Sequence, residues 1–419
     1  MTKSKNTGGK SNISCSSFLS DANVIKMTPE PMPLLKKVTG IKPKVTYTKV
    51  FDYNENIKSI YYTGLDYLNR PTRVFAYIGF PAIASSDNKV PAVVCVHGGG
   101  GNAFPQWVEE WNKRGYAAIA MDTYGNMPSL ENGKMTFIRD EQGAAPPECP
   151  FGTIDQPICN HWMFHAVADT ILANNILRAD NRVLPDKIGL TGISWGGIIT
   201  GITIGVDNRF AFAIPVYGCG YLNHSKTYFK EYKNKKIAEF WGVENYIPFI
   251  EAPVFWLSGD SDPCFDILCF AKTVINTKEA TCTIKPSMIH SHNHGWESEE
   301  IYRFADSISK DKKPDVKIIT QPNKYMGKNV NLNVEISNEI EIPIVRAYYM
   351  TEPLVYIKGQ IGPRSQLKGN WEFVDGTYKD ATISIQLPDE VYCYYVNVIA
   401  SIINTKQHLI YSTNIVLLN

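Results

Sequence analysis

The stretch "KIGLTGISWGG", Lys187 to Gly197, decides the fold: an apolar run leads into Gly-Ile-Ser-Trp-Gly. A serine between two such glycines predicts a sharp turn from a strand into a helix, with the Ser194 hydroxyl held clear of the backbone. Glycine is expected at both flanking positions because the helix and a neighbouring strand must approach closely. The pattern also occurs by chance in ordinary packed turns, but its place between strand and helix makes Ser194 the candidate nucleophile.

Strand-like and helical segments alternate around this turn, from "PAVVCVHG" (91–98) to "SEEIYRFADSISKD" (298–311). This alternation is typical of an α/β fold with a doubly wound, mostly parallel sheet, whose chemistry gathers at the carboxyl ends of the strands. Residues 45–79 alternate as antiparallel strands do. We expect two interruptions, residues 123–160 as a shaped loop and residues 221–250 as a partly helical segment, to wall a pocket.

The domain boundaries follow from changes in this pattern. Residues 1–40 are rich in Ser, Lys, Asn and Pro and are predicted to be a tail or strap, followed by an α/β catalytic domain over 41–312. Strand-like runs without helices fill residues 313–419. They predict a C-terminal all-β domain, a β-sandwich of immunoglobulin-like character.

Composition limits the classes of partner. The 419 residues include 42 basic and 41 acidic side chains, a formal charge of +1, so we expect no nucleic-acid and no anionic-membrane surface. No apolar run reaches transmembrane length, and the polar N-terminus lacks the apolar stretch of a secretory signal. Nine cysteines without C-x-x-C spacing, among them Cys95, Cys282 and Cys393 in apolar strands, favour a reduced, cytoplasmic protein. A periplasmic or secreted location stays open, as does the oligomeric state.

A serine nucleophile needs a histidine base and an orienting carboxylate, which in this architecture follow in the order serine, acid, histidine. The run "VFWLSGDSDPCF" (254–265) ends a strand in acids, and Asp262 is the predicted acid with Asp260 as the alternative. The run "TCTIKPSMIHSHNHGW" (281–296) then supplies His290 as the predicted base, with His292 as its rival.

The same histidines allow a metal hypothesis. In an extended segment His290, His292 and His294 would face one way and could bind a transition metal. No cysteine ligand adjoins these histidines in the sequence, and a triad already accounts for one of them. We therefore expect no metal and no cofactor.

Four glycines follow His97 in "VVCVHGGGGNAF" (93–104). A phosphate loop would require a Lys-Ser or Lys-Thr pair that is missing, whereas a dinucleotide site stays a minor alternative because Asp122 lies near the expected spacing. Beside the serine turn, an oxyanion hole is favoured, with amides from Gly99 (or Gly100) and Trp195.

Four further side chains near these elements receive predicted roles. His97 is expected to brace the glycine loop rather than to act as a base. Tyr124, Tyr217 and Trp296 fall just after strands, so they are possible substrate contacts.

The stretches "HGGGGNAF", "WNKRGYAAIAMDTYG", "KIGLTGISWGG" and "HSHNHGW" resemble the α/β-hydrolase superfamily, and more narrowly bacterial acetyl xylan esterases and prolyl-oligopeptidase-like serine hydrolases, over about residues 60–309. The resemblance implies a serine esterase, with Ser194 as nucleophile, Asp262 as acid and His290 as base, acting on a small-molecule or acylated carbohydrate substrate. Dienelactone hydrolases share the fold but use cysteine at the turn, which disfavours that activity. The alternatives are a peptidase, although too few residues precede His97 for a β-propeller, and an inactive carbohydrate-binding homologue.

Overall fold

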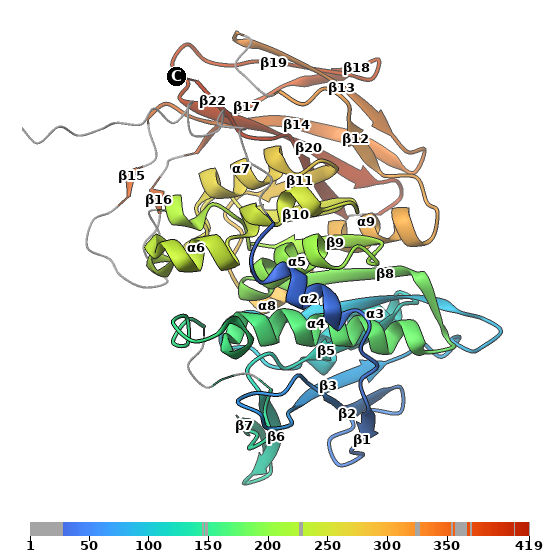
Figure 1. Ribbon diagram of the computed structural model, residues 1–419. Helices are drawn as coiled ribbons and strands as arrows, with labels where there is room; N and C mark the ends of the chain where they lie inside the picture. The colour runs from blue at the N-terminus through green and yellow to red at the C-terminus, as the bar shows by residue number, and fades with distance from the viewer. Residues whose placement is uncertain are drawn as a thin grey trace, which may run out of the picture.

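The computed structural model describes residues 28–144, 146, 150–225, 229–322, 327–352, 355–356, 367–368, 371–405 and 407–418. A mixed sheet forms its centre, and its first nine strands run in the order β1-β2-β3-β5-β4-β8-β9-β10-β11 (Figure 1). Strands β5, β4, β8, β9, β10 and β11 are parallel, and β3 meets β5 antiparallel. The strands are β1 (Val45–Tyr47), β2 (Ile57–Thr63), β3 (Arg73–Gly79), β4 (Val90–Val96), β5 (Ala117–Met121), β8 (Val183–Ile193), β9 (Phe212–Val216), β10 (Val254–Gly259) and β11 (Ala280–Lys285). The predicted α/β architecture is confirmed.

Helices cover both faces of this sheet. The helices are α2 (Met32–Val38), α3 (Pro105–Lys113), α4 (Trp162–Ala179), α5 (Trp195–Val206), α6 (Lys235–Trp241), α7 (Ile267–Asn276), α8 (His292–Trp296) and α9 (Glu299–Ser309). Ile57 and Tyr62 of β2 are five residues apart, so they face opposite sides of the sheet. Gly79, which pairs with Ile57 and shares its face, lies against α3. The Tyr62 hydroxyl, on the other face, donates to a carbonyl of α4 at 2.9 Å, so α3 and α4 cover opposite faces. Within the described residues, none of the helices is long and apolar enough to cross a membrane.

The two predicted interruptions differ in kind. Residues 123–160, expected to be a loop, contain an antiparallel hairpin of β6 (Asn126–Glu131) and β7 (Lys134–Arg139), which projects at the end of the molecule opposite the C-terminal strands (Figure 1). Residues 145 and 147–149 lie outside the described part. Residues 221–250 hold α6 and short 3₁₀ turns, so the partly helical prediction is confirmed. Residues 1–27 of the predicted N-terminal tail or strap (1–40) lie outside the described part. In the remainder, α2 packs on α4 and buries Met32, Leu35 and Val38.

Apart from the separate antiparallel pair β15–β16, the C-terminal strands form two antiparallel layers with a core of their own, which includes Leu332, Ala347, Ile383 and Val396. One layer has the order β12-β13-β19-β18, and the other runs β21-β20-β14-β17 with β22 beside β20. The strands are β12 (Val316–Ile318), β13 (Asn329–Ile336), β14 (Ile340–Met350), β15 (Val355–Tyr356), β16 (Leu367–Lys368), β17 (Glu372–Asp375), β18 (Thr377–Lys379), β19 (Thr382–Gln386), β20 (Cys393–Ile402), β21 (His408–Ser412) and β22 (Val416–Leu417). The immunoglobulin-like character stays a prediction.

One of these layers is continuous with the central sheet of the α/β part, whereas the sequence pattern had placed residues 313–419 in a domain of their own. Strand β21 pairs with β11 through Cys282 and Ser412, so the central sheet continues into the C-terminal strands. The Ser412 hydroxyl accepts from the Ile284 amide at 2.7 Å and donates to Asn397, whose own amide donates to the Ile284 carbonyl at 3.1 Å. The C-terminal layer therefore covers the edge of the sheet that an unpaired β11 would leave open.

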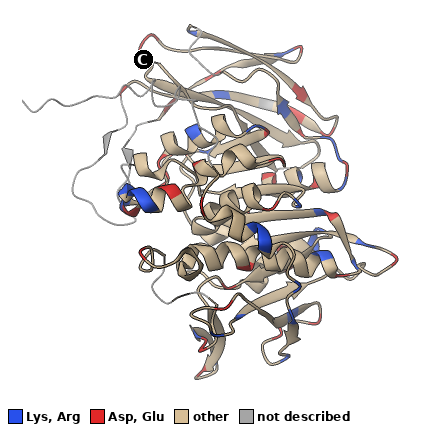
Figure 2. Ribbon diagram, viewed as in Figure 1, with Lys and Arg blue, Asp and Glu red and all other residues tan. Residues whose placement is uncertain are grey.

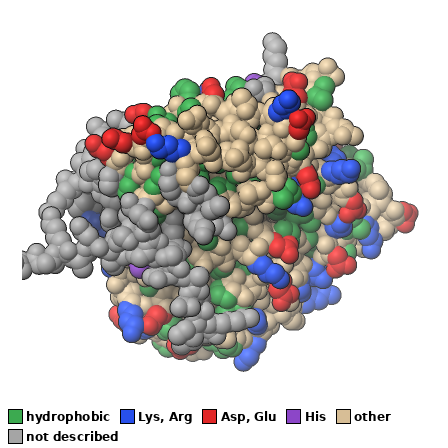
Figure 3. Space-filling view, turned by 90° about the horizontal axis from the view of Figure 1, so that it is seen from above, with side chains coloured by type: hydrophobic (Ala, Val, Ile, Leu, Met, Phe, Trp, Pro, Cys, Tyr) green, Lys and Arg blue, Asp and Glu red, His purple; other side chains and the backbone are tan. Residues whose placement is uncertain are grey.

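Charged side chains are mixed in sign over the molecule. Lys and Arg lie among Asp and Glu over the ribbon (Figure 2), and the view from above the C-terminal strands shows both signs interspersed (Figure 3). Cys95, Cys282 and Cys393 are buried and form no disulfide, as predicted.

Candidate active site

Ser194 lies between the end of β8 and the start of α5 in a strained backbone conformation, with φ 59° and ψ −116°. A side-chain carbon on Gly196 would lie 2.0 Å from the carbonyl oxygen of Val96, and one on Gly192 would lie 2.1 Å from the carbonyl oxygen of Gly196. No side chain fits at those distances, so both flanking positions require glycine. The predicted strand–turn–helix element with Ser194 at its apex is confirmed.

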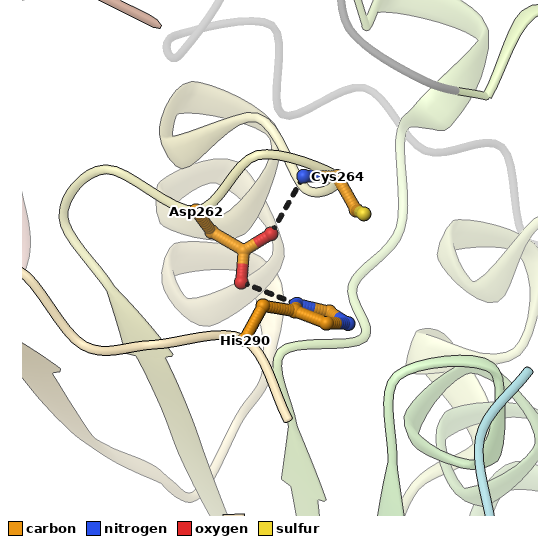
Figure 4. A group of neighbouring side chains, drawn as sticks. All are labelled: Asp262, Cys264 and His290. Carbon is orange, nitrogen blue, oxygen red and sulfur yellow. Dashed lines mark hydrogen bonds and ion pairs between the residues drawn. The ribbon is translucent and has the colours of Figure 1, made fainter. Parts of the chain in front are cut away.

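A chain of hydrogen bonds joins three predicted side chains at the carboxyl ends of β8, β10 and β11. His290 Nε2 lies 3.0 Å from Ser194 Oγ, and its Nδ1 lies 2.7 Å from Asp262 Oδ2 (Figure 4 shows the second contact). Because a carboxylate only accepts, Nδ1 carries the proton and Nε2 is free to accept from the serine. This tautomer is the one that proton transfer from Ser194 requires.

The carboxylate of Asp262 is fully buried and oriented by the backbone. Its Oδ1 accepts from the amides of Cys264 and Phe265, each at 2.8 Å, which leaves Oδ2 for His290 (Figure 4). Two donors on one oxygen hold the carboxylate plane against rotation.

The alternative acid, Asp260, lies elsewhere. It accepts from the Ser287 amide at 2.9 Å and from the Tyr395 hydroxyl at 3.2 Å, and burial raises the pKa of its carboxyl. Asp260 therefore links the α/β part to the C-terminal layer, and Asp262 is the acid that reaches the imidazole.

Two aromatic rings pack on the imidazole of His290. The Tyr217 ring centroid lies 4.3 Å from that of His290, and the Phe265 ring stacks at 6.0 Å. Tyr217 is fully buried and donates from its hydroxyl to the Ile289 carbonyl at 2.9 Å. This burial favours packing of the histidine loop over the substrate contact proposed from its position in the sequence.

The glycine loop lies against the serine turn. The Gly98 amide donates to His292 Nε2 at 3.0 Å, whereas Gly99 is exposed and a side-chain carbon there would lie 3.7 Å from the Trp195 ring. Among the described residues, no hydrogen-bond acceptor contacts the amide nitrogen of Gly99 or of Trp195. These two amides are the donors expected for an oxyanion hole. The Gly98 amide is not a third donor, because it already donates to His292.

His97 braces the loop, as the sequence predicts. Its Nδ1–H donates to the Gly98 carbonyl at 2.8 Å and its Nε2 accepts from the Thr123 amide at 2.9 Å, so one neutral tautomer satisfies both contacts. Burial lowers the pKa of His97 to about 4. Thr123 had not been singled out, since nothing but its place after β5 distinguishes it in the sequence.

The three histidines of H-x-H-x-H do not converge. His290 contacts Asp262 and Ser194, His292 contacts Gly98, and His294 Nδ1 lies 2.7 Å from the Ser291 hydroxyl at the start of α8. The chain turns into a helix at His292, which removes the extended spacing that the metal hypothesis assumed. Across the described ranges, the group of possible cation ligands is instead Asp262, Cys264 and His290, whose ligand atoms lie within 4.8 Å of one another (Figure 4).

The other proposed substrate contacts occupy different surroundings. Tyr124 is half-buried, stacks on Trp162 at 5.4 Å, and points its hydroxyl to within 3.7 Å of where a side-chain carbon on Gly99 would lie. Trp296 is buried and packs at 5.3 Å on Phe104. Tyr124 is thus the one that borders the predicted oxyanion position.

Aromatic side chains that the sequence analysis missed surround the Trp195 ring. Phe229 lies at 5.2 Å and Phe151 at 5.7 Å, both centroid to centroid, and Phe229 also contacts Phe265 at 4.6 Å. Both come from the two interrupting segments, whose irregular sequences carry no periodic signal that would orient a side chain.

Solved structures resemble parts of this chain at low sequence identity. The acetyl xylan esterase from Paenibacillus sp. R4 is 18% identical, with a TM-score of 0.51, over 70% of this chain and 94% of that one. Acetyl xylan esterase 1 from Thermoanaerobacterium sp. JW/SL YS485 is 17% identical, with a TM-score of 0.49, over 68% and 95%. An acylaminoacyl peptidase from Pyrococcus horikoshii is 15% identical, with a TM-score of 0.46, over 63% and 44%.

No curated protein sequence matches the chain. Residues 76–303, more than half of its length, match the dienelactone hydrolase family, and this span contains the serine turn, the acid loop, the histidine loop and the glycine loop. The chain belongs to the dienelactone hydrolase family.

Proposed function

We propose that this protein is a serine carboxylic-ester hydrolase that works through an acyl-enzyme on Ser194, with His290 as base and Asp262 as orienting acid. The observation that carries the proposal is the unbroken hydrogen-bonded chain from Asp262 Oδ2 through both ring nitrogens of His290 to Ser194 Oγ. A hydroxyl is a weak nucleophile at neutral pH, and a base in this position is what activates it.

In the acylation step, Ser194 Oγ bonds to the ester carbonyl carbon while His290 Nε2 accepts the hydroxyl proton. The tetrahedral intermediate then breaks its carbon–oxygen bond to the alcohol, which leaves with the proton from Nε2. In the second half, a water molecule gives a proton to Nε2 and attacks the acyl carbon. Ser194 leaves with that proton, and a carboxylic acid is released. Asp262 stays ionised and holds the imidazole in the required tautomer.

The negative charge on the tetrahedral oxygen requires donors already in place. We assign them to the amides of Gly99 and Trp195, one from the glycine loop and one from the first residue of α5. Tyr124, with its hydroxyl beside Gly99, is the side chain we place closest to the bound ester.

For the substrate we propose an acetylated carbohydrate of the acetyl xylan type. A structure of similar fold carries the name acetyl xylan esterase, and the aromatic side chains around Trp195 offer apolar faces against which sugar rings can pack. The serine at the turn, where dienelactone hydrolases use cysteine, leads us to expect no dienelactone hydrolase activity.

The test is hydrolysis of p-nitrophenyl esters from acetate to octanoate, and of acetylated xylan, by wild type and Ser194→Ala. We expect turnover that is fastest on acetate and lost in the variant, with Ser225→Ala, a serine away from the triad, as the matched control. Ester turnover that survives Ser194→Ala would overturn the proposal. Hydrolysis of a dipeptide p-nitroanilide in a panel run alongside would identify a peptidase. Hydrolysis of a dienelactone is measured as well, to test the activity for which the family is named.

A further inference from the structure

The histidine loop makes a second contact with the site that the triad does not use. Two residues beyond His290, the imidazole of His292 accepts the Gly98 amide at 3.0 Å. That contact joins segments 194 residues apart and lies at the base of the glycine loop. Backbone groups buried in such a loop need a partner, and His292 is the partner of this one.

The Gly98 residue is held at both its backbone groups by neutral histidines. Its amide donates to His292, and its carbonyl accepts from His97 Nδ1–H at 2.8 Å and from the Gly101 amide at 3.1 Å. The peptide plane that contains the Gly98 carbonyl also contains the Gly99 amide, which points the opposite way in a trans peptide. Fixing Gly98 therefore fixes the direction of the Gly99 N–H.

The surroundings leave little room for another arrangement. A side-chain carbon on Gly101 would lie 2.8 Å from His292 Nε2, and one on Gly98 would lie 2.6 Å from the Ile193 carbonyl oxygen. Phe104 packs on the His292 ring at 4.8 Å and Trp296 at 6.3 Å. The ring is thus held with its Nε2 toward the loop.

We infer that His292 is a positioning residue for the oxyanion hole, an inference that rests on the proposed function. His292 holds Gly98, and through it the Gly99 amide, in the geometry that receives the developing oxyanion. The same short segment carries the base in His290, so one loop sets both the proton acceptor and the anion site. His292 touches neither the substrate nor the reacting atoms, and it acts through Gly98.

The role requires His292 to be an acceptor, and hence neutral. Burial lowers its pKa to about 4, and the titratable groups that face it are His290 on its own segment and His97 across the loop. Gln offers a carbonyl oxygen close to the position of Nε2, whereas Leu fills the space without an acceptor. These two variants separate the hydrogen bond from the packing.

The experiment compares kcat and KM on p-nitrophenyl acetate for wild type, His292→Leu and His292→Gln, with His294→Leu as the matched control on an exposed neighbour. Removing an oxyanion donor outright costs about 10²–10³-fold in kcat, so a misplaced donor is expected to cost about 10- to 100-fold, with little change in KM. His292→Gln should recover most of that loss, and His294→Leu should resemble wild type. A His292→Leu enzyme with wild-type kcat, or a His292→Gln enzyme as impaired as His292→Leu, overturns the inference.

Amide hydrogen exchange of the peptide containing Gly98 tests the same contact without any substrate. His292→Leu should exchange Gly98 faster than wild type and His292→Gln at an intermediate rate; equal rates in all three overturn the inference. If wild type hydrolyses no ester, the proposed function fails while the exchange result still decides whether His292 holds the loop.

Discussion

Replacing Asp262 by Asn should abolish nearly all activity while leaving the fold intact, because of the contacts of its two carboxylate oxygens. Asp262 Oδ1 accepts two backbone amides at 2.8 Å each, so the carbonyl oxygen of an asparagine must occupy that position. In the opposite orientation the NH₂ group would point at two N–H donors and leave them unpaired. Each buried group left unpaired costs about 1–3 kcal/mol of stability. The asparagine NH₂ therefore points at His290 Nδ1.

That orientation reverses the tautomer of His290. An NH₂ group donates, so Nδ1 must become the acceptor and the proton moves to Nε2, which lies 3.0 Å from Ser194 Oγ. The imidazole can then no longer accept the serine proton. A wrong tautomer of this kind lowers kcat by about 10⁴-fold, which corresponds to about 5 kcal/mol in the activation free energy.

The assay is kcat on p-nitrophenyl acetate with Asp260→Asn as the matched control. Asp260 is a buried carboxyl two residues away, and it contacts the Tyr395 hydroxyl, which can accept from an NH₂ group in return. Asp260→Asn should therefore keep most of the activity. An Asp262→Asn enzyme within about tenfold of wild type, or an equal loss in both variants, would refute the tautomer argument.

Three other predictions follow from single contacts. Folding lowers the pKa of His97 from 6.5 to about 4, so the unfolded state binds the proton first as the pH drops. The contribution of His97 to the free energy of unfolding should therefore be complete above pH 6.5 and fall by up to about 3 kcal/mol toward pH 4. Urea unfolding at pH 7 and pH 4 should show a smaller loss for His97→Gln, and an identical pH dependence would contradict the assignment. Gly196→Ala places a carbon 2.0 Å from a backbone oxygen and should cost about 3 kcal/mol of stability, so a wild-type Tm would show that the turn is not rigid. Tyr395→Phe removes a donor to buried Asp260 and should cost about 1–3 kcal/mol in chemical unfolding, whereas unchanged stability would mean that this link between the two parts contributes nothing.

Much of this protein could be predicted from local patterns alone. The Gly-x-Ser-x-Gly turn is recognisable locally, because the sequence places Gly192 and Gly196 around the serine and between a strand-like and a helical run. The alternation of apolar and amphipathic runs predicts the parallel sheet, and the order of serine, acid and histidine follows from the strands they terminate.

The choices within each loop could not be predicted in the same way. Asp260 and Asp262 follow one strand and His290 and His292 follow another, and their order along the chain does not say which side chain points where. Hydrogen bonds in the folded chain decide it. The amides of Cys264 and Phe265 hold Asp262 so that its other oxygen reaches His290, and the helix that begins at His292 brings its ring to Gly98, 194 residues away.

The sequence by itself therefore determined the α/β class, the serine turn and the small set of candidate side chains, because each depends on residues that are near neighbours along the chain. The tertiary structure alone decided which histidine meets Ser194, which acid meets that histidine, and that β21 continues the sheet beyond β11. These outcomes depend on hydrogen bonds and packing between segments tens to hundreds of residues apart, which no local pattern encodes.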